Sequence, residues 1–364
     1  MDTVRYGIIG TGMMGVEHIS NLLAMDGAAV TALADPEPRS LDLALQAVGP
    51  DHPPARFADH RQLIASGTCD AVVIASPNHT HHDVLLDVLA SPLHVLVEKP
   101  LCTTVADCRA VVAAAADGPP ERVVWMGLEY RYMPPTQQLL GEVRRGTVGT
   151  VRMVAIREHR FPFLHKVGNW NRFNRNTGGT LVEKCCHYFD LMNLVVGNRP
   201  RRVMASGAQD VNHLDEVYDG EVPDVIDNAY VVVEYDGGAR AMLDLCMFAE
   251  ASKNEQELCV VGDDGRVEAL VSERLLRIGR RADGLGNVTE RRVEDARVRF
   301  KGFHHGSSYL EHVDFLSAIR AGGPAAVTLE DGLWSVAIGE AAHRSIDTNG
   351  WVDVAELVDA TAPR

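Results

Sequence analysis

The sequence lacks the features that would place the protein in a membrane or outside the cell. It contains no apolar run near the roughly 18 residues needed to cross a bilayer. Residues 1–6 do not form a basic region followed by an apolar core, so we expect no signal peptide. The seven cysteines are odd in number and show no CxxC spacing, which favours a reducing cytoplasm over a disulfide framework.

Basic residues are also scarce. The chain has 35 Lys plus Arg against 50 Asp plus Glu, a formal net charge of −15 that would repel a polyanion. Arginine pairs occur, but they are scattered among acidic residues. We therefore expect a soluble, acidic cytoplasmic protein with neither nucleic acid nor membrane as a partner. The 364 residues, 46% of them apolar, indicate a globular chain of about two domains.

The first 100 residues alternate between strand and helix patterns. Short apolar runs predict strands at 4–9, 28–34, 71–75 and 93–97. Helical spacing of apolar residues predicts helices at 14–24, 40–48 and 80–89. This alternation is typical of βαβ units, so we expect an α/β domain with a doubly wound parallel sheet over residues 1–125.

Beyond residue 150 the pattern changes to strands without intervening helices. We predict strands at 151–157, 202–209, 228–235, 240–247 and 256–261, then helices at 309–320 and 332–347. The segment Asp236-Gly237-Gly238 lies between two of these strands and is a strong hairpin signal. Residues 126–364 are therefore expected to form an α+β domain with a large, mostly antiparallel open sheet.

A glycine-rich turn follows the first predicted strand and opens the first predicted helix. Residues 10–15 read Gly-Thr-Gly-Met-Met-Gly and fit G-x-G-x-x-G, in which Gly10 permits a tight turn, Gly12 a close approach to a diphosphate, and Gly15 helix–strand packing. Asp35 ends the second strand, where a carboxylate would bind ribose hydroxyls and repel a 2′-phosphate. This pattern predicts a dinucleotide site that prefers NAD to NADP, a preference that Arg39 could soften.

Two further strand ends point to the same crevice, because ligands of open parallel sheets bind beyond the carboxyl ends of the strands. Residues 75–78 read Ala-Ser-Pro-Asn after one buried strand, and Glu98-Lys99-Pro100 follows the next. Lys99 is therefore a candidate functional residue, although an exposed lysine whose stem covers apolar surface fits the sequence as well.

The densest cluster of reactive side chains lies at 178–191. Thr180 is a plausible N-cap with Glu183 completing a capping box, and on one helix Glu183 and His187 would share a face, as suits proton transfer. A capping glutamate beside a core histidine explains the same residues. Zinc is disfavoured because a helix would splay Cys185, Cys186 and His187 apart. A solvent-facing Lys184 is expected.

Together these segments resemble the Gfo/Idh/MocA family of nicotinamide-dependent oxidoreductases. The resemblance covers nearly the whole chain and includes the glycine turn, the 75–78 strand end with His81, Glu98-Lys99-Pro100, and the Gly-Gly helix with His187 and Asp190. It implies a Rossmann domain followed by the open-sheet domain, which would build a homodimer or homotetramer. Two positions depart from the usual pattern, since Glu183 replaces an Asp and Cys185 replaces a Gly.

The resemblance also implies roles for individual residues. Lys99 would hydrogen-bond the reacting hydroxyl, His187 would be the general acid/base with Glu183 as its partner, and the Lys99–Pro100 peptide would be cis. No metal is implied. The expected cofactor contacts are Gly10, Thr11, Gly12, Met13, Met14, Gly15, Asp35, Arg39, Ser76, Pro77, Asn78, His81, Glu98 and Lys99. The expected substrate contacts are Lys99, Arg131, Tyr132, Trp170, Asn171, Arg172, Glu183, His187 and His304.

The activity that follows is hydride transfer between NAD and a secondary alcohol of a sugar, an inositol or a related cyclic polyol. Two alternatives stay open. One is a glycoside-cleaving enzyme on the same fold that oxidises, eliminates and then reduces. The other is a sensor that binds NAD without catalysis, for which the Lys99 and His187 pair would have little use.

Overall fold

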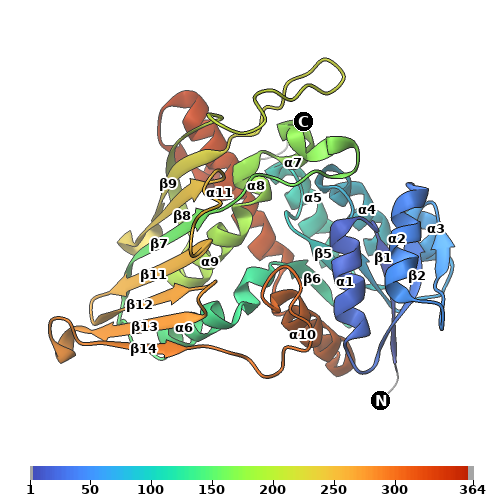
Figure 1. Ribbon diagram of the computed structural model, residues 1–364, viewed down its shortest axis with the longest axis horizontal. Helices are drawn as coiled ribbons and strands as arrows, with labels where there is room; N and C mark the ends of the chain where they lie inside the picture. The colour runs from blue at the N-terminus through green and yellow to red at the C-terminus, as the bar shows by residue number, and fades with distance from the viewer. Residues whose placement is uncertain (1–2, 360–364) are drawn as a thin grey trace. The chain divides into compact units, whose positions relative to one another are not determined.

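The computed structural model describes residues 3–359, and the chain forms two compact units (Figure 1). Of the described residues, unit 1 comprises 3–129, 166–170 and 296–333, and unit 2 comprises 130–165, 171–295 and 334–359. These units are interleaved along the chain, whereas the domains expected at 1–125 and 126–364 are continuous. That continuous division stays a prediction.

Unit 1 is built on a parallel sheet. Within residues 3–359 this sheet has six strands in the order β3-β2-β1-β4-β5-β6, and neighbouring strands are parallel. The strands are β1 (Val4–Ile9), β2 (Ala28–Ala34), β3 (Ala55–Phe57), β4 (Ala71–Ile74), β5 (His94–Glu98) and β6 (Val124–Gly127). This is the strand order of the dinucleotide-binding Rossmann fold, so the predicted α/β fold is confirmed.

The helices of unit 1 alternate with its strands in the chain, except the last, which follows the strands of unit 2. They are α1 (Met13–Leu23), α2 (Pro38–Val48), α3 (His60–Ala65), η1 (Asn78–Thr80), α4 (His81–Leu89), α5 (Val105–Ala116) and α10 (Ser307–Ala321). Helix α2 begins two residues before the predicted start, because the Glu37 side chain caps the backbone N–H of Arg39 and Pro38 occupies the first turn. Helix α10 packs on α1, and Phe315 contacts the rings of Tyr6 and Trp125.

Unit 2 contains a larger, mixed sheet. In the described part of the chain it has nine strands in the order β14-β13-β12-β11-β7-β10-β9-β8-β15; β7 and β10 pair in parallel and the other pairs are antiparallel. The strands are β7 (Val151–His159), β8 (Pro200–Ala208), β9 (Asn228–Tyr235), β10 (Arg240–Cys246), β11 (Gln256–Gly262), β12 (Gly265–Leu270), β13 (Leu275–Arg280), β14 (Val288–Arg292) and β15 (Val352–Asp353). The predicted mostly antiparallel sheet and the hairpin at 236–238 are confirmed.

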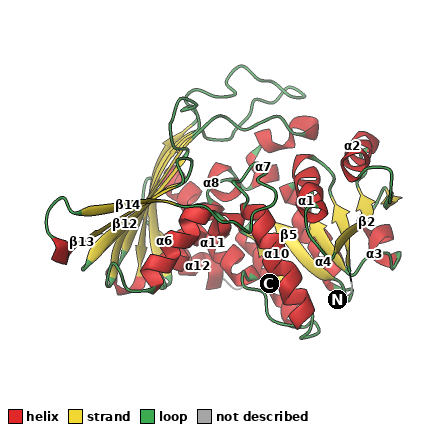
Figure 2. Ribbon diagram, turned by 60° about the horizontal axis from the view of Figure 1, so that its bottom comes forward, coloured by secondary structure: helices red, strands yellow, loops and turns green. Residues whose placement is uncertain are grey.

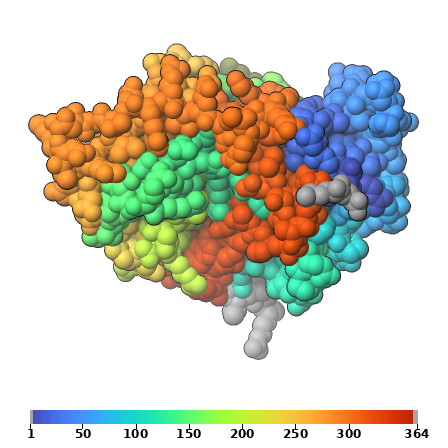
Figure 3. All heavy atoms as spheres, turned by 90° about the horizontal axis from the view of Figure 1, so that it is seen from below, coloured from blue at the N-terminus to red at the C-terminus, as the bar shows by residue number. Residues whose placement is uncertain are grey.

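Helices cover one face of the unit 2 sheet. Helix α6 (Pro134–Arg144) contacts β12 and β13, α9 (Cys186–Val196) contacts β7, and α12 (Val354–Asp359) contacts β8. Figure 2 shows these helices on one side of the sheet, and in Figure 3 the green surface of α6 lies beside the orange strands. The remaining helical segments are η2 (Glu129–Tyr132), η3 (Val167–Arg172), α7 (Asn174–Thr177), α8 (Thr180–Glu183), η4 (Asp236–Gly238), η5 (Arg281–Asp283) and α11 (Leu329–Thr348).

Strand alternation decides which side chains reach that covered face. In β7, Val154, Ile156 and Glu158 are buried, whereas the residues between them are more exposed. A charged side chain thus follows two apolar ones into the interior, toward α9. Strands β12, β13 and β14 were not predicted, and every residue of β14 is exposed, as suits a polar edge strand without a core signal.

Candidate functional site

The glycine turn of unit 1 has the geometry that its motif requires. Gly10 has φ +87°, and a Cβ there would lie 2.4 Å from the Ser76 backbone nitrogen. A Cβ on Gly15 would lie 2.2 Å from the Gly10 carbonyl oxygen, so the helix packs directly on the turn. A Cβ on Gly12 would meet nothing within 4 Å. The start of α1 is therefore open at Gly12, where backbone N–H groups can receive a diphosphate.

Asp35 is fixed beside this turn at the end of β2. One carboxylate oxygen accepts hydrogen bonds from the Thr11 backbone N–H (2.7 Å) and hydroxyl (3.2 Å), and the other accepts from the Glu37 N–H (2.8 Å). A negative charge is thus held at the position expected for a ribose contact. Of the other residues expected to contact the cofactor here, Met13 and Arg39 are exposed and Met14 is half-buried.

The end of β4 carries a buried amide that suits a ligand. Asn78 is buried, and its side-chain nitrogen has no hydrogen-bond partner among the described residues. Ser76 pairs its hydroxyl with that of Thr80. His81 is fully buried, with its ring nitrogens 2.8 Å from the Pro100 carbonyl oxygen and 3.0 Å from that of Ser76. His81 therefore joins two strand-end loops, and a direct contact between its ring and the cofactor stays a prediction.

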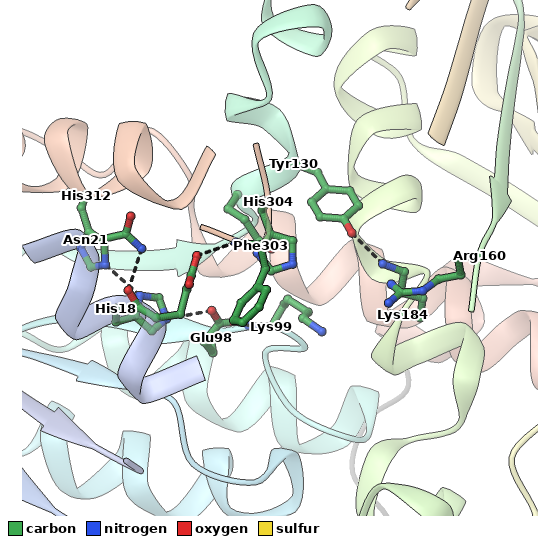
Figure 4. Close-up of polar contacts among 12 residues, drawn as sticks. His18, Asn21, Glu98, Lys99, Tyr130, Arg160, Lys184, Phe303, His304 and His312 are labelled. Carbon is green, nitrogen blue, oxygen red and sulfur yellow. Dashed lines mark hydrogen bonds and ion pairs between the residues drawn. The ribbon is translucent and has the colours of Figure 1, made fainter. Parts of the chain in front are cut away.

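Glu98 and Lys99 follow β5, and the Lys99–Pro100 peptide is cis, as the resemblance implied. The buried Glu98 carboxylate lies 2.9 Å from His18 Nε2 and accepts the Lys99 backbone N–H at 3.1 Å. Burial alone would raise the pKa of Glu98, but His18, Lys99 and His304 lower it to about 2. The carboxylate is therefore ionised, and it holds the backbone from which the Lys99 side chain projects (Figure 4).

A chain of imidazoles extends from Glu98 into unit 1. His18 Nδ1 lies 2.8 Å from His312 Nε2, and both rings are buried between α1 and α10. Burial and the neighbouring His18 lower the pKa of His312 well below its usual range. This Glu98–His18–His312 chain was not predicted from the sequence. His18 lies about one helical turn after Gly15 in α1. This position on the same side of the helix as the glycine turn is the sequence signal that could have pointed to His18.

The loop at 302–306 is attached to α1. The Phe303 N–H donates to the Glu17 carboxylate at 3.0 Å, and Phe303 and His304 are labelled in Figure 4. His304 Nδ1 lies 3.8 Å from a Glu129 oxygen. His304 thus belongs to unit 1 together with Lys99. Trp170, another expected substrate contact, also lies in unit 1, where its ring meets His79 edge-on at 6.2 Å.

The capping box predicted at Thr180 is wrong. Gly179 is the N-cap, with φ +88°, and a Cβ there would lie 2.3 Å from His343 Nε2. The Thr180 hydroxyl instead donates to the Ile226 carbonyl oxygen at 2.6 Å. The single helix is also wrong, because it is divided into α8 (Thr180–Glu183) and α9 (Cys186–Val196). Glu183 and His187 therefore belong to consecutive short helices, and both are buried.

His187 is stacked on Tyr130 in unit 2. The ring centroids are 3.9 Å apart and the planes differ by 5°. The Tyr130 hydroxyl accepts a hydrogen bond from Lys184 Nζ at 2.6 Å, and Lys184 forms an ion pair with Glu158 at 3.1 Å. The expected solvent-facing Lys184 is wrong, because its side chain is buried in this network. Burial lowers the pKa of Lys184, Arg160 acts in the same direction and Glu158 opposes them.

Glu158 is the centre of the charged network in unit 2. It is fully buried and pairs with Arg160 Nη1 at 3.4 Å in addition to Lys184. The Tyr188 hydroxyl donates to the second Glu158 oxygen. Sequence reasoning missed Tyr130, Glu158 and Arg160. Glu158 lies two residues after Ile156, so strand alternation places it on the buried side of β7. That alternation is the sequence signal that could have identified Glu158.

The other expected substrate residues of unit 2 are held by protein partners. The Arg131 guanidinium forms a two-pronged ion pair with the buried Asp190. Arg172 is buried and pairs with Glu216 at 2.7 Å. The side chain of Asn171 is likewise buried and donates to the Leu164 carbonyl oxygen at 2.9 Å, and Tyr132 is buried. Whether any of them also touches substrate stays a prediction.

All seven cysteines lie in the described part of the chain, and all are free thiols. Among residues 3–359 there is no group of three or more His, Cys, Asp or Glu that could hold a metal ion. No helix within that range has the length and apolar character needed to span a membrane.

Comparison with known proteins agrees with this geometry. The model "Oxidoreductase family, NAD-binding Rossmann fold" matches residues 4–125, and "Oxidoreductase family, C-terminal alpha/beta domain" matches 141–354. A myo-inositol 2-dehydrogenase of Thermotoga maritima is 27% identical over 98% of this chain and 100% of its own length. Inositol 2-dehydrogenase 1 of Saccharopolyspora erythraea is 29% identical over 99% of this chain and 98% of its own length. A levoglucosan dehydrogenase structure with NADH and levoglucosan shares the fold, with a TM-score of 0.83 at 20% identity over 97% of this chain and 100% of that one.

Proposed function

The chain belongs to the Gfo/Idh/MocA family of oxidoreductases, and on that premise we propose that it is an NAD-dependent dehydrogenase of a cyclic polyol. The substrate class is a sugar, an inositol or a related ring that presents a secondary alcohol. Its inositol dehydrogenase relatives and the levoglucosan dehydrogenase of like fold support that class. The observation that carries the cofactor half of the proposal is the glycine turn, which is closed around Gly10 and Gly15 and open at Gly12.

The residues of unit 1 fit a dinucleotide. The α1 start at Gly12 would receive the diphosphate, Asp35 the adenosine ribose, and the buried amide nitrogen of Asn78 an oxygen of the nicotinamide half. The fixed charge of Asp35 would repel a 2′-phosphate, so we propose NAD rather than NADP. Arg39, four residues away, is exposed and would have to move to offset that charge.

The chemistry assigned to the chain's own side chains is proton transfer and charge stabilisation. When bound, NAD⁺ supplies the hydride acceptor. The positive charge of Lys99 would stabilise negative charge on the reacting oxygen. The ionised Glu98 holds the backbone that carries this side chain. His187 would take the hydroxyl proton and Glu183 would orient its ring. Lys99 belongs to unit 1 and His187 to unit 2, so the proposal requires both units.

A substrate screen combined with two variants tests this function. Inositols, aldoses, glycosides and anhydrosugars are incubated with NAD or NADP, and reduced nicotinamide is followed by absorbance. We expect turnover with NAD, a fall of about 10³-fold or more in kcat for Lys99→Met and His187→Ala, and NAD binding that persists in both variants. Lys253→Met and His52→Ala, at exposed positions, are the matched controls.

The same screen separates the other two activities. A glycoside-cleaving enzyme would release its aglycone without net reduced nicotinamide, and a sensor would bind NAD and turn over nothing. Near-normal kcat in Lys99→Met or in His187→Ala would refute the role assigned to that residue.

We further propose that the protein forms a homodimer or homotetramer through the uncovered face of the unit 2 sheet. This face exposes Met153, Tyr230, Val232 and Met242 on the adjoining strands β7, β10 and β9. Exposed large apolar side chains gathered on one sheet face are typical of a surface buried against another chain. A second copy presenting the same face would satisfy a two-fold interface.

A further inference from the structure

The surroundings of His187 contain more than the acidic partner expected from the sequence. Tyr130, Glu158, Lys184 and Tyr188 are at most 5% exposed, and they form one connected set of contacts against the His187 ring. A buried lysine needs strong compensation, because desolvation disfavours its charged form. Here the compensation comes from the Glu158 carboxylate on β7. The lysine donates a hydrogen bond to the Tyr130 hydroxyl (Figure 4), and the Tyr130 ring is stacked on His187.

His187 is stacked on Tyr130 of η2, which also carries Glu129 and Arg131, and further charged groups of this contact network lie on α8, α9 and β7. Helix α8 contributes Glu183, the connection to α9 contributes Lys184, and α9 contributes Tyr188 and Asp190, the last neutralised by Arg131. Strand β7 contributes Glu158, which is followed in the chain by Arg160. The titratable neighbours therefore include two cations, Lys184 and Arg160, that share Glu158. A third cation, Arg131, forms an ion pair with Asp190.

We propose that Tyr130 and Lys184 are positioning residues that set the ring plane and the protonation state of His187. The proposal rests on the proposed function for its meaning in catalysis, but the effect on His187 is a property of unit 2 alone. Tyr130 fixes the imidazole plane by face-to-face stacking, Lys184 fixes Tyr130 through its hydroxyl, and Glu158 fixes Lys184.

The two positioning residues act on the imidazole with opposite sign. An aromatic face attracts a cation, so the Tyr130 ring favours the protonated imidazolium. A neighbouring ammonium disfavours it, so Lys184 favours the neutral ring that can accept a proton from an alcohol. Glu158 reduces the effect of Lys184 because it shares the charge. Removing Lys184 should therefore raise the titration midpoint of His187, and removing Tyr130 or Glu158 should lower it.

The test is an NMR titration of the full chain labelled in its histidine rings, without substrate. The His187 signal is identified by its absence in His187→Gln. We expect the midpoint to rise by about one pH unit in Lys184→Met and to fall by a similar amount in Glu158→Gln and in Tyr130→Leu. Tyr130→Phe keeps the stacked ring but loses the hydroxyl that Lys184 holds, so its midpoint should move less than that of Tyr130→Leu.

The double variant Lys184→Met/Glu158→Gln removes both charges of the Lys184–Glu158 pair together, so that the only ion pair it breaks one-sidedly is the longer one between Glu158 and the partly exposed Arg160. Its midpoint should return toward the wild-type value. Midpoints that move in the same direction in Lys184→Met and Glu158→Gln, or a His187 ring whose protonation never differs among the variants, would overturn the proposal. A purely structural role would not move the midpoints in this order.

Activity provides a separate readout. If the proposed function holds, the acid limb of the kcat profile for alcohol oxidation moves with the NMR midpoint. Lys184→Met is then about tenfold slower on that limb for each pH unit by which the midpoint rises, and it recovers at higher pH. Lys184→Arg, which keeps the charge, should restore most of the wild-type profile. Absence of turnover in the wild type, together with the ordered NMR midpoints, would refute the proposed function and leave this inference standing.

Discussion

Glu98 shows how one buried carboxylate is kept charged. Its low pKa comes from a hydrogen bond with His18 and from the charges of His18, Lys99 and His304, which outweigh the cost of burial. A carboxylate whose folded pKa lies below its unfolded value of 4.5 stabilises the fold above pH 4.5, and that contribution is lost as the pH falls toward about 2. The residue beside the proposed catalytic lysine is thus also a source of acid sensitivity.

Replacing Glu98 by Gln isolates that contribution. We expect the free energy of unfolding of the wild type to exceed that of Glu98→Gln near neutral pH, and the difference to shrink by an amount on the order of 3 kcal/mol as the pH falls from 4.5 to about 2. Urea unfolding at several pH values measures it. Glu221→Gln, which removes an exposed carboxylate from its ion pair with Arg175, is the control for loss of a surface charge. A constant difference at all pH values would contradict the assignment.

At the scale of elements, α1 links three segments of unit 1 that carry proposed site residues. Its first residues form the glycine turn, Glu17 holds the loop at 302–306, and His18 holds Glu98 at the end of β5. Consecutive residues of a helix point about 100° apart, so Glu17 and His18 can address different neighbours from adjacent positions. The helix that would receive the diphosphate therefore also organises the loops that carry His304 and Lys99.

Loss of the Glu17 carboxylate should release the 302–306 loop. In Glu17→Ala the Phe303 N–H loses its acceptor, and we expect amide hydrogen exchange across 302–306 to become about tenfold faster or more. Ser20→Ala, on the same helix, removes only a local bond to the Val16 carbonyl oxygen and should leave the loop unchanged. Exchange rates that are equal in Glu17→Ala and the wild type would show that other contacts hold this loop.

The division of the expected helix at Lys184 is the clearest difference between sequence and structure at this scale. Capping-box spacing is a local pattern. In the structure Gly179 packs closely on the His343 ring, and the Thr180 hydroxyl donates a hydrogen bond to the Ile226 carbonyl oxygen. Both partners are distant in the chain. No window around Thr180 contains them, so the local pattern could not reveal the competition.

At the scale of the whole molecule, the two faces of the unit 2 sheet differ in what covers them. One face is covered by helices and carries Glu158 toward His187, whereas the other presents methionine, tyrosine and valine to the outside. Period-two alternation in β7, β9 and β10 sorts these side chains between the faces. The exposed face is therefore the one on which the proposed association would take place.

A charge placed on the open face should separate the copies. We expect Tyr230→Glu and Met242→Glu to reduce the wild-type oligomer to monomers in sedimentation velocity, because each would bury an unpaired carboxylate in an apolar interface. Leu285→Glu, at a fully exposed position between β13 and β14, is the control and should keep the wild-type sedimentation. A monomeric wild type, or an oligomer that survives both substitutions, would refute the proposed interface.

The sequence by itself determined the parallel sheet, the glycine turn with Asp35, the strand-end position of Lys99 and the hairpin of unit 2. These features are local, because strand period, glycine spacing and turn residues act over a few neighbouring positions. Only the tertiary structure decided that Tyr130 covers His187, that Glu158 pairs with Lys184 and that His18 reaches Glu98. Each of those pairs except Glu158 and Lys184 is separated by more than 50 residues, and even these two lie in different elements. Their meeting depends on how strands and helices pack, which hydrophobic periodicity does not specify.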